Sequence, residues 1–341
     1  MIKTSVVILN WNGRVFLEKF LDKVIKYSLS DNCSIYVADN GSTDDSCAYV
    51  RQKHPQVSLL ELGYNYGFAR GYNEALKMVE SEYYVLLNSD VEVSPGWLDP
   101  VISYMDSDPD TAVCQPKILS YADNSKFEYA GAAGGFIDKY GYPFCRGRVM
   151  NITEEDRGQY DDVKKIFWAS GACMFIRSSA WKEYEGFDPF FFAHMEEIDL
   201  CWRLNNKGKK IMYIPTSVVY HIGGGTLSYD SPMKIFYNFR NNLFLLYKNL
   251  PGRKLHKIMF IRMCLDGIAA IRFLITLKLN AFSKVVKAHI HYYQHRKALR
   301  DKRKELQKDI IQYPGELILN KSLVFSFFIR KRRTYSQLMN D

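Results

Sequence analysis

The polar triplet Asn88-Ser89-Asp90 ends a strongly apolar run of the sequence, and its side chains are suited to bind a charged group. Asp90 is the best candidate of the three for a ligand of Mg²⁺ or Mn²⁺, and Asn88 could hold a ribose or a bound water. These ions need few protein ligands when phosphate oxygens and water fill the other positions. The expected second ligand is His221, which follows a strand-like run and precedes the glycines 223–225. A lone histidine is more often structural, but its position at a strand-to-loop edge favours a role as ligand.

A second candidate for chemistry is the acidic run Glu196, Glu197 and Asp199, at the start of a helix predicted over about 193–207. The macrodipole at a helix start stabilises ionised carboxylates. Asp199 and Arg203 are spaced i,i+4 with the acid first, which favours an ion pair on one helix face. Glu197 lies on a different face and is left free to act as a general base toward a hydroxyl. Taken alone, the run could also be an acidic helix start that only caps the helix.

Asp39 and the segment 65–76 have features of a nucleotide site. Asp39 follows an apolar run and precedes a turn, where its carboxylate could accept a hydrogen bond from the N3–H of uracil or thymine. Asn65 and two glycines precede a predicted helix, and such a helix start lets the backbone approach an anion closely. Arg70 could help to neutralise a diphosphate. Each of these residues also has an ordinary explanation, as a turn, surface or packing residue, and none is decisive alone.

Strand-like and helix-like segments alternate through the first ninety residues and predict how these side chains are positioned. The expected strands are 5–9, 34–38, 57–61 and 83–87. This alternation predicts a parallel, doubly wound α/β sheet with helices on both faces, in which ligands bind at the carboxyl ends of the strands. The polar residues at those ends are Asn10 and Asn12 after the first strand, Asp39 after the second, and Asn88 with Asp90 after the fourth. Three polar strand ends on one edge predict a single shared site.

The pattern becomes less regular beyond Pro95. Many glycines are present up to about Phe192, which predicts shorter, partly antiparallel strands and long loops. The run 166–176 is predicted as a strand, and a further strand is predicted at 210–215, after the acidic helix.

The net charge of +9 is distributed unevenly along the 341 residues. Residues 1–247 contain 25 Lys and Arg against 31 Asp and Glu, a balance of −6, whereas residues 248–341 contain 21 against 6, a balance of +15. An acidic body and a basic tail should have different partners. The seven scattered cysteines form no C-x-x-C pair, which fits the reduced thiols of a cytoplasmic protein.

The basic tail is predicted to be helical and amphipathic. Residues 258–277 are apolar in bulk but contain Arg262, Asp266 and Arg272, so they lack the ~20 apolar residues of a membrane-spanning helix. Basic residues beside the apolar run 322–329 predict a surface that lies on an anionic bilayer, at the inner face of the plasma membrane. The alternative is a set of ordinary helices packed on the main domain with a solvated basic face. Nucleic-acid binding is disfavoured, because no recognised nucleic-acid module accompanies the charge.

Seven segments of the chain resemble, in order, the motifs of one enzyme family. They are VVILNWNG, VADNGSTDDS, NYGFARGYNEAL, LLNSDVEV, SGACMFIRSSAW, GFDPFFFAHMEEIDLCWRLNNKG and IPTSVVYHIGGGT. With these motifs the chain is similar to the family 2 glycosyltransferases, which have the GT-A fold, and most of all to their bacterial rhamnosyltransferase-like and galactofuranosyltransferase-like branch. The resemblance covers about residues 3 to 240 and leaves the basic tail outside the shared core.

The resemblance implies a nucleotide-binding and metal-binding role for four matched residues. The residue at the Asp39 position binds the pyrimidine base in that family. Asp90 matches the last acid of the D-x-D motif, which binds the metal, whereas Asn88 departs from the pattern by replacing the first acid. The family also uses a histidine some two dozen residues after its catalytic acid as a metal ligand, and His221 falls there.

The resemblance also implies that Glu197 is the catalytic base, because it matches the second acid of the family's acidic pair. That acid is usually aspartate, and glutamate moves the carboxylate by one methylene, so Glu196 stays open as the alternative. The pocket for the sugar and the acceptor is expected to include Trp168, Ser170, Gly171, Glu196 and Asp199.

The implied activity is an inverting, metal-dependent transfer of a sugar from a nucleoside-diphosphate donor, dTDP-rhamnose or a UDP-sugar, to a hydroxyl of a glycan. The basic tail suggests a lipid-linked acceptor at the cytoplasmic membrane face, in cell-surface polysaccharide synthesis. The expected domains are a GT-A domain, 1–250, with a nucleotide-binding half 1–120 and an acceptor-binding half 121–250, and a basic helical tail, 251–341. The oligomeric state is left open.

Three other classes of protein are alternatives to a transferase. A non-catalytic sugar-nucleotide or glycan-binding protein could keep the same fold, but the complete set of Glu197, Asp90 and His221 argues against it. A nucleotidyltransferase would need a glycine- and lysine-rich phosphate loop after the first strand, and VVILNWNG is not one. A dinucleotide-dependent oxidoreductase would need a G-x-G-x-x-G motif after a strand, and the sequence has none there.

Overall fold

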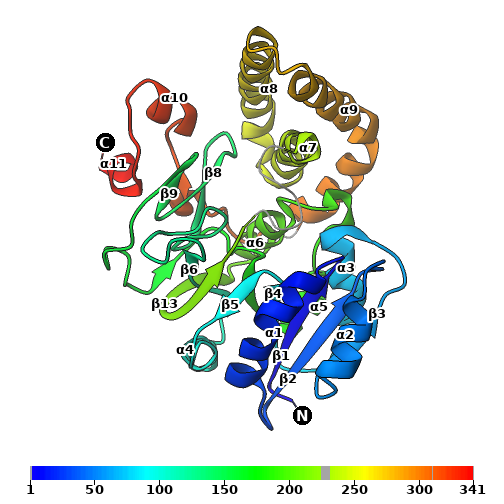
Figure 1. The fold of residues 1–341 in the computed structure, drawn as a ribbon. Helices are drawn as coiled ribbons and strands as arrows, with labels where there is room; N and C mark the ends of the chain where they lie inside the picture. The colour runs from blue at the N-terminus through cyan, green and yellow to red at the C-terminus, as the bar shows by residue number, and fades with distance from the viewer. Residues whose placement is uncertain (1, 224–230, 309, 341) are drawn as a thin grey trace.

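The computed structural model describes residues 2–223, 231–308 and 310–340, and Figure 1 shows their arrangement. Its central feature is a nine-stranded sheet with the order β11-β13-β6-β12-β4-β1-β2-β3, in which β5 also pairs with β13. The strands are β1 (Thr4–Asn10), β2 (Cys33–Asp39), β3 (Ser58–Glu61), β4 (Tyr83–Asn88), β5 (Val91–Val93), β6 (Thr111–Ser120), β11 (Lys164–Lys165), β12 (Cys173–Arg177) and β13 (Lys210–His221).

Strands β1 to β4 form the parallel part of this sheet, and each covers a stretch that the sequence predicts as a strand. In their register Asn10 pairs with Asp39, and Leu9 pairs with Asn88. The polar strand ends therefore meet at one edge of the sheet. This confirms the predicted α/β class with a mostly parallel central sheet.

The other part of the sheet is mixed, as the irregular pattern after Pro95 predicts. Strand β12 runs antiparallel to both β4 and β6, and β13 runs parallel to β6. The prediction of one strand over 166–176 is wrong in its first half, because β12 begins only at Cys173. The preceding backbone bonds to several partners instead of one strand: the N–H of Ile166 donates to the carbonyl of Ile211, and that of Ser170 to the side chain of Gln115.

Helices cover both faces of the central sheet. The first face carries α1 (Arg14–Ser28), α2 (Ser46–Lys53) and α4 (Asp99–Ser107), and the second carries α3 (Gly67–Leu76), α5 (Ser178–Glu183) and α6 (Glu196–Asn206). Alternation along β1 shows why two cores form: Val6 and Ile8 are buried in the first core, and Val7 in the second.

A small second sheet packs beside the first and includes a strand from the end of the chain. Its order is β10 (Ile152–Thr153), β9 (Arg148–Val149), β8 (Pro143–Cys145), β7 (Gly135–Asp138) and β14 (Ile318–Leu319). After β14 come α10 (Leu323–Phe328) and α11 (Tyr335–Met339), whose Tyr335 ring lies 5.5 Å from that of Phe136. The end of the tail thus returns to the α/β part and crosses the boundary expected at residue 250.

Three long helices form the C-terminal helical region: α7 (Pro232–Asn249), α8 (Gly252–Ile275) and α9 (Leu279–Lys308). Figure 1 shows them grouped at one end of the molecule, with α6 between them and the central sheet. Helix α7 is buried along its second half, whereas α8 and α9 form a hairpin. No helix in the described ranges is long and apolar enough to cross a membrane.

Candidate active site

A cavity of about 770 Å³ opens at the carboxyl ends of β1 and β4, bounded by the start of α6, by α7 and by the end of β13. The structure brings most of the predicted site residues together there. Those that line the cavity are Asn65, Asn88, Asp90, Trp168, Ser170, Gly171, Glu196, Glu197 and His221. Those that do not are Asn10, Asn12, Asp39, Arg70 and Asp199.

Asp90 and His221 are in direct contact at the wall of this cavity, because β13 pairs with β5 just beyond the triplet. His221 is the register partner of Val91, and its Nε2 lies 3.1 Å from Oδ1 of Asp90. Both side chains are buried. Two ligands in adjacent positions of an octahedral Mg²⁺ site, each at about 2.1 Å, are separated by roughly 3 Å. The spacing of the two side chains therefore fits a shared divalent ion.

Glu128 completes a line of three titratable groups and was not found from the sequence. Its Oε2 lies 3.4 Å from Nδ1 of His221, on the side away from Asp90. Burial alone would lower the pKa of His221, but Glu128 and Asp90 outweigh it and raise that pKa to about 10. A carboxylate behind a histidine is the usual arrangement that orients a metal-binding imidazole. The raised pKa keeps a proton on the ring when no ion is bound, so a metal at Nε2 would have to displace that proton. Within the described ranges, no group of three His, Cys, Asp or Glu side chains could hold a metal ion by itself. The other ligands would have to be oxygens of a bound phosphate or of water.

The loop before α6 is held in an uncommon backbone conformation next to the cavity. Phe192, His194 and Met195 have φ angles of 61°, 69° and 74°. Side chains disfavour this region, at roughly 1–3 kcal/mol for each residue. The buried Asn241 of α7 holds the loop, because its Nδ2 donates to the carbonyls of Ala193 and His194 at 2.8 and 2.6 Å. Helix α7 thus sets the position at which the acidic helix begins.

Glu197 and Glu196 follow this loop, and both carboxylates are held with incomplete hydrogen bonding. Oε2 of each has no hydrogen-bond partner among the described residues. Burial raises the pKa of Glu197 to about 7, although backbone N–H groups at the helix start oppose the shift. Burial and the neighbouring Glu197 raise the pKa of Glu196 well above its usual range. A carboxyl with a pKa near neutrality is well matched to accept a proton from a hydroxyl.

His194 is a second polar residue of the cavity that the sequence did not single out. Its Nε2 is buried and makes no hydrogen bond within the described part of the chain. Burial, together with Lys234, lowers the pKa of His194 to about 4, so the imidazole is neutral at pH 7. A neutral imidazole beside Glu197 can orient a hydroxyl. The only available signal was its place three residues before Glu197.

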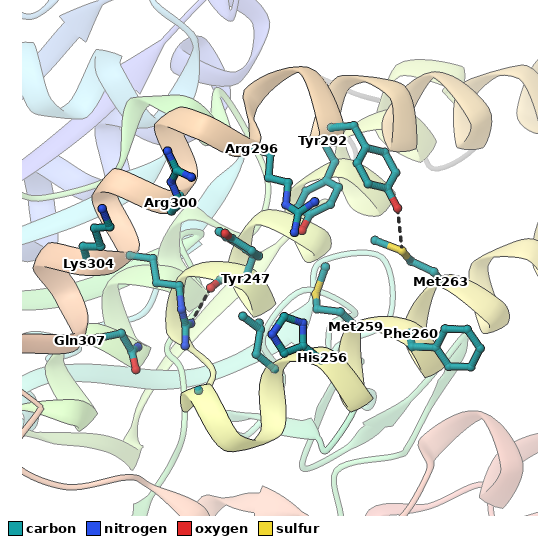
Figure 2. Close-up of a pocket in the computed structure, with 14 residues that line it drawn as sticks. Tyr247, His256, Met259, Phe260, Met263, Tyr292, Arg296, Arg300, Lys304 and Gln307 are labelled. Atoms are coloured by element: carbon teal, nitrogen blue, oxygen red, sulfur yellow. Dashed lines mark hydrogen bonds between the residues drawn. The ribbon is translucent and has the colours of Figure 1, made fainter.

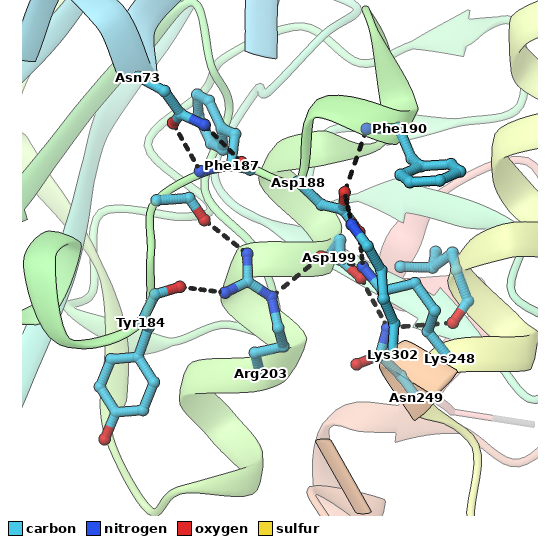
Figure 3. Close-up of polar contacts among 12 residues, drawn as sticks. Asn73, Tyr184, Phe187, Asp188, Phe190, Asp199, Arg203, Lys248, Asn249 and Lys302 are labelled. Atoms are coloured by element: carbon cyan, nitrogen blue, oxygen red, sulfur yellow. Dashed lines mark hydrogen bonds and ion pairs between the residues drawn. The ribbon is translucent and has the colours of Figure 1, made fainter. Parts of the chain in front are cut away.

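Asp199 lies outside the cavity, contrary to the expectation that it contacts a substrate. Figure 3 shows its carboxylate enclosed by protein groups: Nζ of Lys248 lies at 2.9 Å, Nε of Arg203 at 3.0 Å and Nδ2 of Asn249 at 2.8 Å. The predicted i,i+4 pair with Arg203 is confirmed. Burial alone would raise the pKa of Asp199, but Lys248 and Arg203 outweigh it and lower that pKa. Asp199 is a structural residue that joins α6 to α7.

The residues expected to hold the nucleotide base lie behind the cavity lining. Nδ2 of Asn10 lies 3.3 Å from Oδ1 of Asp39, whose Oδ2 accepts the N–H of Ser42 at 3.0 Å. Asn40 links this group to the cavity, since its Nδ2 donates to the carbonyl of Gly67 at 3.0 Å. Gly67 has a φ of 74°, and a Cβ there would lie 2.7 Å from the ring of Phe192. These turns therefore pack against the loop that precedes α6.

Asn12 and Arg70 stand farther from the cavity. Oδ1 of Asn12 accepts the N–H of Thr43 at 2.7 Å and so supports the turn after β2. Arg70 is exposed and pairs with Glu74 at 3.4 Å. Contact of Arg70 with a diphosphate stays a prediction, and this geometry gives it no support.

Trp168, Ser170 and Gly171 form one wall of the cavity. The indole N–H of Trp168 donates to the carbonyl of Phe136 at 2.9 Å, and the N–H of Ser170 donates to Gln115 at 2.8 Å. Gly171 lies against the ring of Phe68, 3.2 Å from where a Cβ would stand. The wall is therefore rigid, and small residues in it leave room for a ligand.

Comparison with known proteins gives the same family as the motifs. The sequence profile of glycosyl transferase family 2 matches residues 5–184. The N-acetylglucosaminyl-diphospho-decaprenol L-rhamnosyltransferase of Mycobacterium tuberculosis is 27% identical over 232 residues, which cover 63% of this chain and 75% of that protein. The rhamnosyltransferase WbbL of Escherichia coli K12 is 26% identical over 165 residues, 46% of this chain and 61% of that one.

Solved structures support the fold. GalNAc-T7 with UDP, GalNAc and Mn²⁺ aligns with a TM-score of 0.56 at 15% identity, over 73% of this chain and 48% of that one. S. aureus TarS 1–349 in complex with UDP aligns with a TM-score of 0.51 at 14% identity, over 88% and 89%. With more than half of its length matched by the family profile, the chain belongs to glycosyl transferase family 2 and is a glycosyltransferase.

Proposed function

We propose that this glycosyltransferase is an inverting, metal-dependent enzyme that moves a sugar from dTDP-rhamnose or a UDP-sugar to a hydroxyl of a lipid-linked glycan. The observation that carries the proposal is the pairing of two features in one cavity. Asp90 and His221 are spaced for a divalent ion, and Glu197, with a pKa of about 7, has a carboxylate oxygen without a hydrogen-bond partner among the residues that the structure describes. Electrophile activation and proton acceptance are the two functions that single displacement needs.

In the proposed reaction the acceptor hydroxyl binds beside Glu197. Its oxygen forms a bond to the anomeric carbon as the bond from that carbon to the diphosphate oxygen breaks, and Glu197 takes the hydroxyl proton. Attack from the face opposite the leaving group inverts the anomeric centre. His194 positions the hydroxyl, and Trp168 with Ser170 bounds the sugar. Asp90 and His221 would hold a divalent ion, which would supply positive charge near the departing diphosphate.

The choice of donor and acceptor rests on the relatives' printed activities. The mycobacterial relative is named for L-rhamnosyl transfer to a diphospho-decaprenol-linked sugar, and WbbL is named a rhamnosyltransferase. Asp39, buried beside Asn10, is the proposed contact of the pyrimidine base. A lipid-linked acceptor would bring the basic tail to the membrane surface, at the cytoplasmic face.

The test is calorimetric titration of the purified protein with UDP, dTDP and GDP, each with and without Mn²⁺. We expect one pyrimidine diphosphate to bind only when Mn²⁺ is present, and EDTA to remove that binding. Asp90→Ala and His221→Ala should abolish it, whereas Asp99→Ala, an exposed acid on α4, should leave it unchanged. Metal-independent binding, or equal binding by Asp90→Ala, contradicts the proposed site. Binding without any transfer to glycolipid extracts would favour a non-catalytic sugar-nucleotide-binding protein.

A further inference from the structure

Helix α8 carries an apolar stripe on the side that points away from the protein. Phe260, Ile268, Ile271 and Ile275 recur at helical spacing and are all exposed, Phe260 at 70% and Ile275 at 75%. The opposite side of α8 is the buried one, with Arg262 paired to Asp266. A soluble helix places its apolar stripe against the core. This second stripe has no cover within the described structure.

Helix α9 carries a matching stripe. Leu279, Val286, Ile290 and Tyr293 are exposed on one face, while Val285, Ala288, Tyr292 and Leu299 are buried on the other. Leu277, in the turn that joins the two helices, is 83% exposed. The hairpin therefore presents two apolar stripes joined by an apolar turn. A continuous exposed apolar surface of this kind marks an interaction site.

The face of α9 changes from apolar to basic beyond Tyr293. Arg296, Arg300 and Lys304 follow at helical spacing, and all three are exposed. Neither Arg296 nor Lys304 has an ion-pair partner among the described residues, and the nearest acid to Arg300 is Asp301 at 4.0 Å. Arg296 and Lys304 therefore offer positive charge that no acid in the described ranges neutralises.

A groove of about 600 Å³ separates the two helices at this basic end. Figure 2 shows Met259, Phe260 and Met263 of α8 on one side and Arg296, Arg300 and Lys304 of α9 on the other. Among the described residues, no Asp or Glu lines the groove. The groove thus has one apolar wall and one basic wall. Phe260 belongs both to the groove and to the stripe on α8.

We propose that the α8–α9 hairpin lies flat on an anionic bilayer, with both apolar stripes in the interface and the phosphate of one phospholipid in this groove. The acyl chains would follow Met259 and Phe260 toward the apolar surface. Amphipathic helices bind in this way when apolar area and basic charge share one face. This membrane contact would bring the enzyme to the lipid-linked acceptor of the proposed function. Only that purpose rests on the proposed function, because the contact itself is argued from the surface of the hairpin.

A second copy of the chain is a poorer occupant of the same surface. A two-fold contact between identical hairpins would place the same patch on both sides of the interface. In an antiparallel arrangement the basic end of one hairpin would cover the apolar turn of the other, and in a parallel one the cations would face like charges. The tail carries a balance of +15, so both arrangements are unfavourable compared with an anionic bilayer.

The chain supplies its own reporter of membrane contact. Cys264 is exposed beside the stripe on α8, whereas the other six cysteines are buried or half-buried. A solvent-sensitive fluorophore on Cys264 should shift to shorter wavelength on vesicles of phosphatidylcholine with phosphatidylglycerol, and far less on phosphatidylcholine alone. Sugar donor and acceptor are left out, so failure to bind vesicles is distinguishable from failure to transfer sugar.

Charge removal tests the groove. Arg296→Ala with Lys304→Ala should weaken binding to the anionic vesicles on the order of 25-fold, since each cation near such a surface contributes roughly fivefold. The matched control is Lys53→Ala with Lys182→Ala, two exposed lysines of the α/β part, which should leave binding unchanged. Native mass spectrometry should find one phosphatidylglycerol retained by the wild type and none by the groove variant. Equal losses in both variants, or equal lipid retention, would remove the groove from the proposal.

An exposed apolar position tests the stripes. Ile275→Glu should weaken binding to vesicles at least tenfold. Val15→Glu, at a site 72% exposed on α1, changes charge equally and should have no effect. Both positions are exposed, so neither variant should unfold the chain. A wild type that forms dimers disrupted by Ile275→Glu, without vesicle binding, would show that a second copy covers the hairpin.

Discussion

Helix α6 carries two kinds of acid within its first four residues. Glu196 and Glu197 line the cavity, have raised pKa values, and each has one oxygen without a hydrogen-bond partner in the described part of the chain. Asp199 points the other way, has both oxygens bonded and has a lowered pKa. Since the macrodipole acts on all three, the helix start does not explain the difference. The difference comes from the neighbours, because Lys248 and Arg203 contact Asp199 and lower its pKa, whereas no cation contributes to the pKa of Glu196 or Glu197.

We call the side of α6 that carries Asp199 its structural face. Two of the cations there come from distant parts of the chain. Lys248 at the end of α7 bridges Asp199 and Asp188, at 2.9 and 2.5 Å, and Lys302 of α9 reaches Asp188 as well (Figure 3). Burial alone would raise the pKa of Asp188, but Lys248 and Lys302 outweigh it and hold that pKa well below its usual range. This cluster fixes α6 to the helical region.

The two faces should contribute to stability with opposite dependence on pH. Asp188 and Asp199 have lowered pKa values, so they stabilise the fold above about pH 4 and lose that contribution as the pH falls through their folded pKa values. Glu196 and Glu197 have raised pKa values, so they weaken the fold as the pH rises above about 4.5, their unfolded value. One face favours stability at neutral pH, and the other opposes it.

The largest expected effect is the loss of transfer in Glu197→Gln. The amide cannot accept the hydroxyl proton, so kcat should fall by roughly 10²- to 10⁴-fold, the usual contribution of a positioned base. Donor binding measured by calorimetry should be unchanged, because Asp90 and His221 are intact. Turnover is to be measured with the donor that binds and a glycolipid acceptor.

Glu196→Gln is the comparison variant for that experiment, since the neighbouring acid is the alternative base. A larger loss of kcat in Glu196→Gln than in Glu197→Gln would assign the proton transfer to Glu196. Near-full activity of a folded Glu197→Gln protein would remove Glu197 from the mechanism.

The next largest effect is expected on the structural face. Asp199→Asn leaves Lys248 and Arg203 buried with less compensating charge, and breaking a buried pair typically costs about 3–5 kcal/mol. We expect the free energy of unfolding in urea at pH 7 to fall by about 3 kcal/mol. Glu74→Gln is the control, because its pairs with Arg70 and Lys77 lie at the surface and should contribute less than about 1 kcal/mol. Equal stability of Asp199→Asn and Glu74→Gln would refute the structural role.

The pH dependence of activity should follow the ionisation of Glu197, on the side of α6 that lines the cavity. A base must be deprotonated, and the pKa of Glu197 is about 7, so kcat/KM should rise about tenfold per pH unit below 7 and level off above it. The structural face should not contribute in this range, because the pKa values of Asp188 and Asp199 lie below it. The measurement is the initial rate between pH 5 and 9 at low substrate. A flat profile from pH 5 upward would place the base elsewhere.

The sequence predicts the part of the site that depends on where single strands and helices begin and end. Asn88 ends β4, Asp90 lies in the turn after it, and His221 ends β13. The carboxyl ends of parallel strands lie at the same edge of a sheet, so these side chains are expected close together. The i,i+4 pair of Asp199 and Arg203 is local to one helix and was predictable for the same reason.

The sequence does not predict contacts that depend on tertiary packing. Glu128 lies in an irregular stretch with no periodicity, and only the pairing of β13 brings His221 against it. Lys248 follows Asp199 by 49 residues, so nothing near Asp199 shows that its carboxylate would be buried in a cation cluster. Asp199 was therefore expected in the substrate pocket beside Glu196, although it faces the opposite side of the helix.

The smallest expected effect is a gain of stability in Glu196→Gln. Burial and Glu197 raise the pKa of Glu196, so ionising this carboxyl in the fold is unfavourable, and a neutral amide of similar shape avoids it. The variant should be more stable than the wild type at pH 7, by on the order of 1 kcal/mol, the usual scale of a single substitution. The gain should vanish at pH 4.5, where the wild-type carboxyl is protonated in the fold. Urea unfolding at both pH values measures this, with Glu74→Gln as the surface control. A gain at pH 4.5 as large as that at pH 7 would show that packing or hydrogen bonding, not the unfavourable buried charge, distinguishes the two faces of α6.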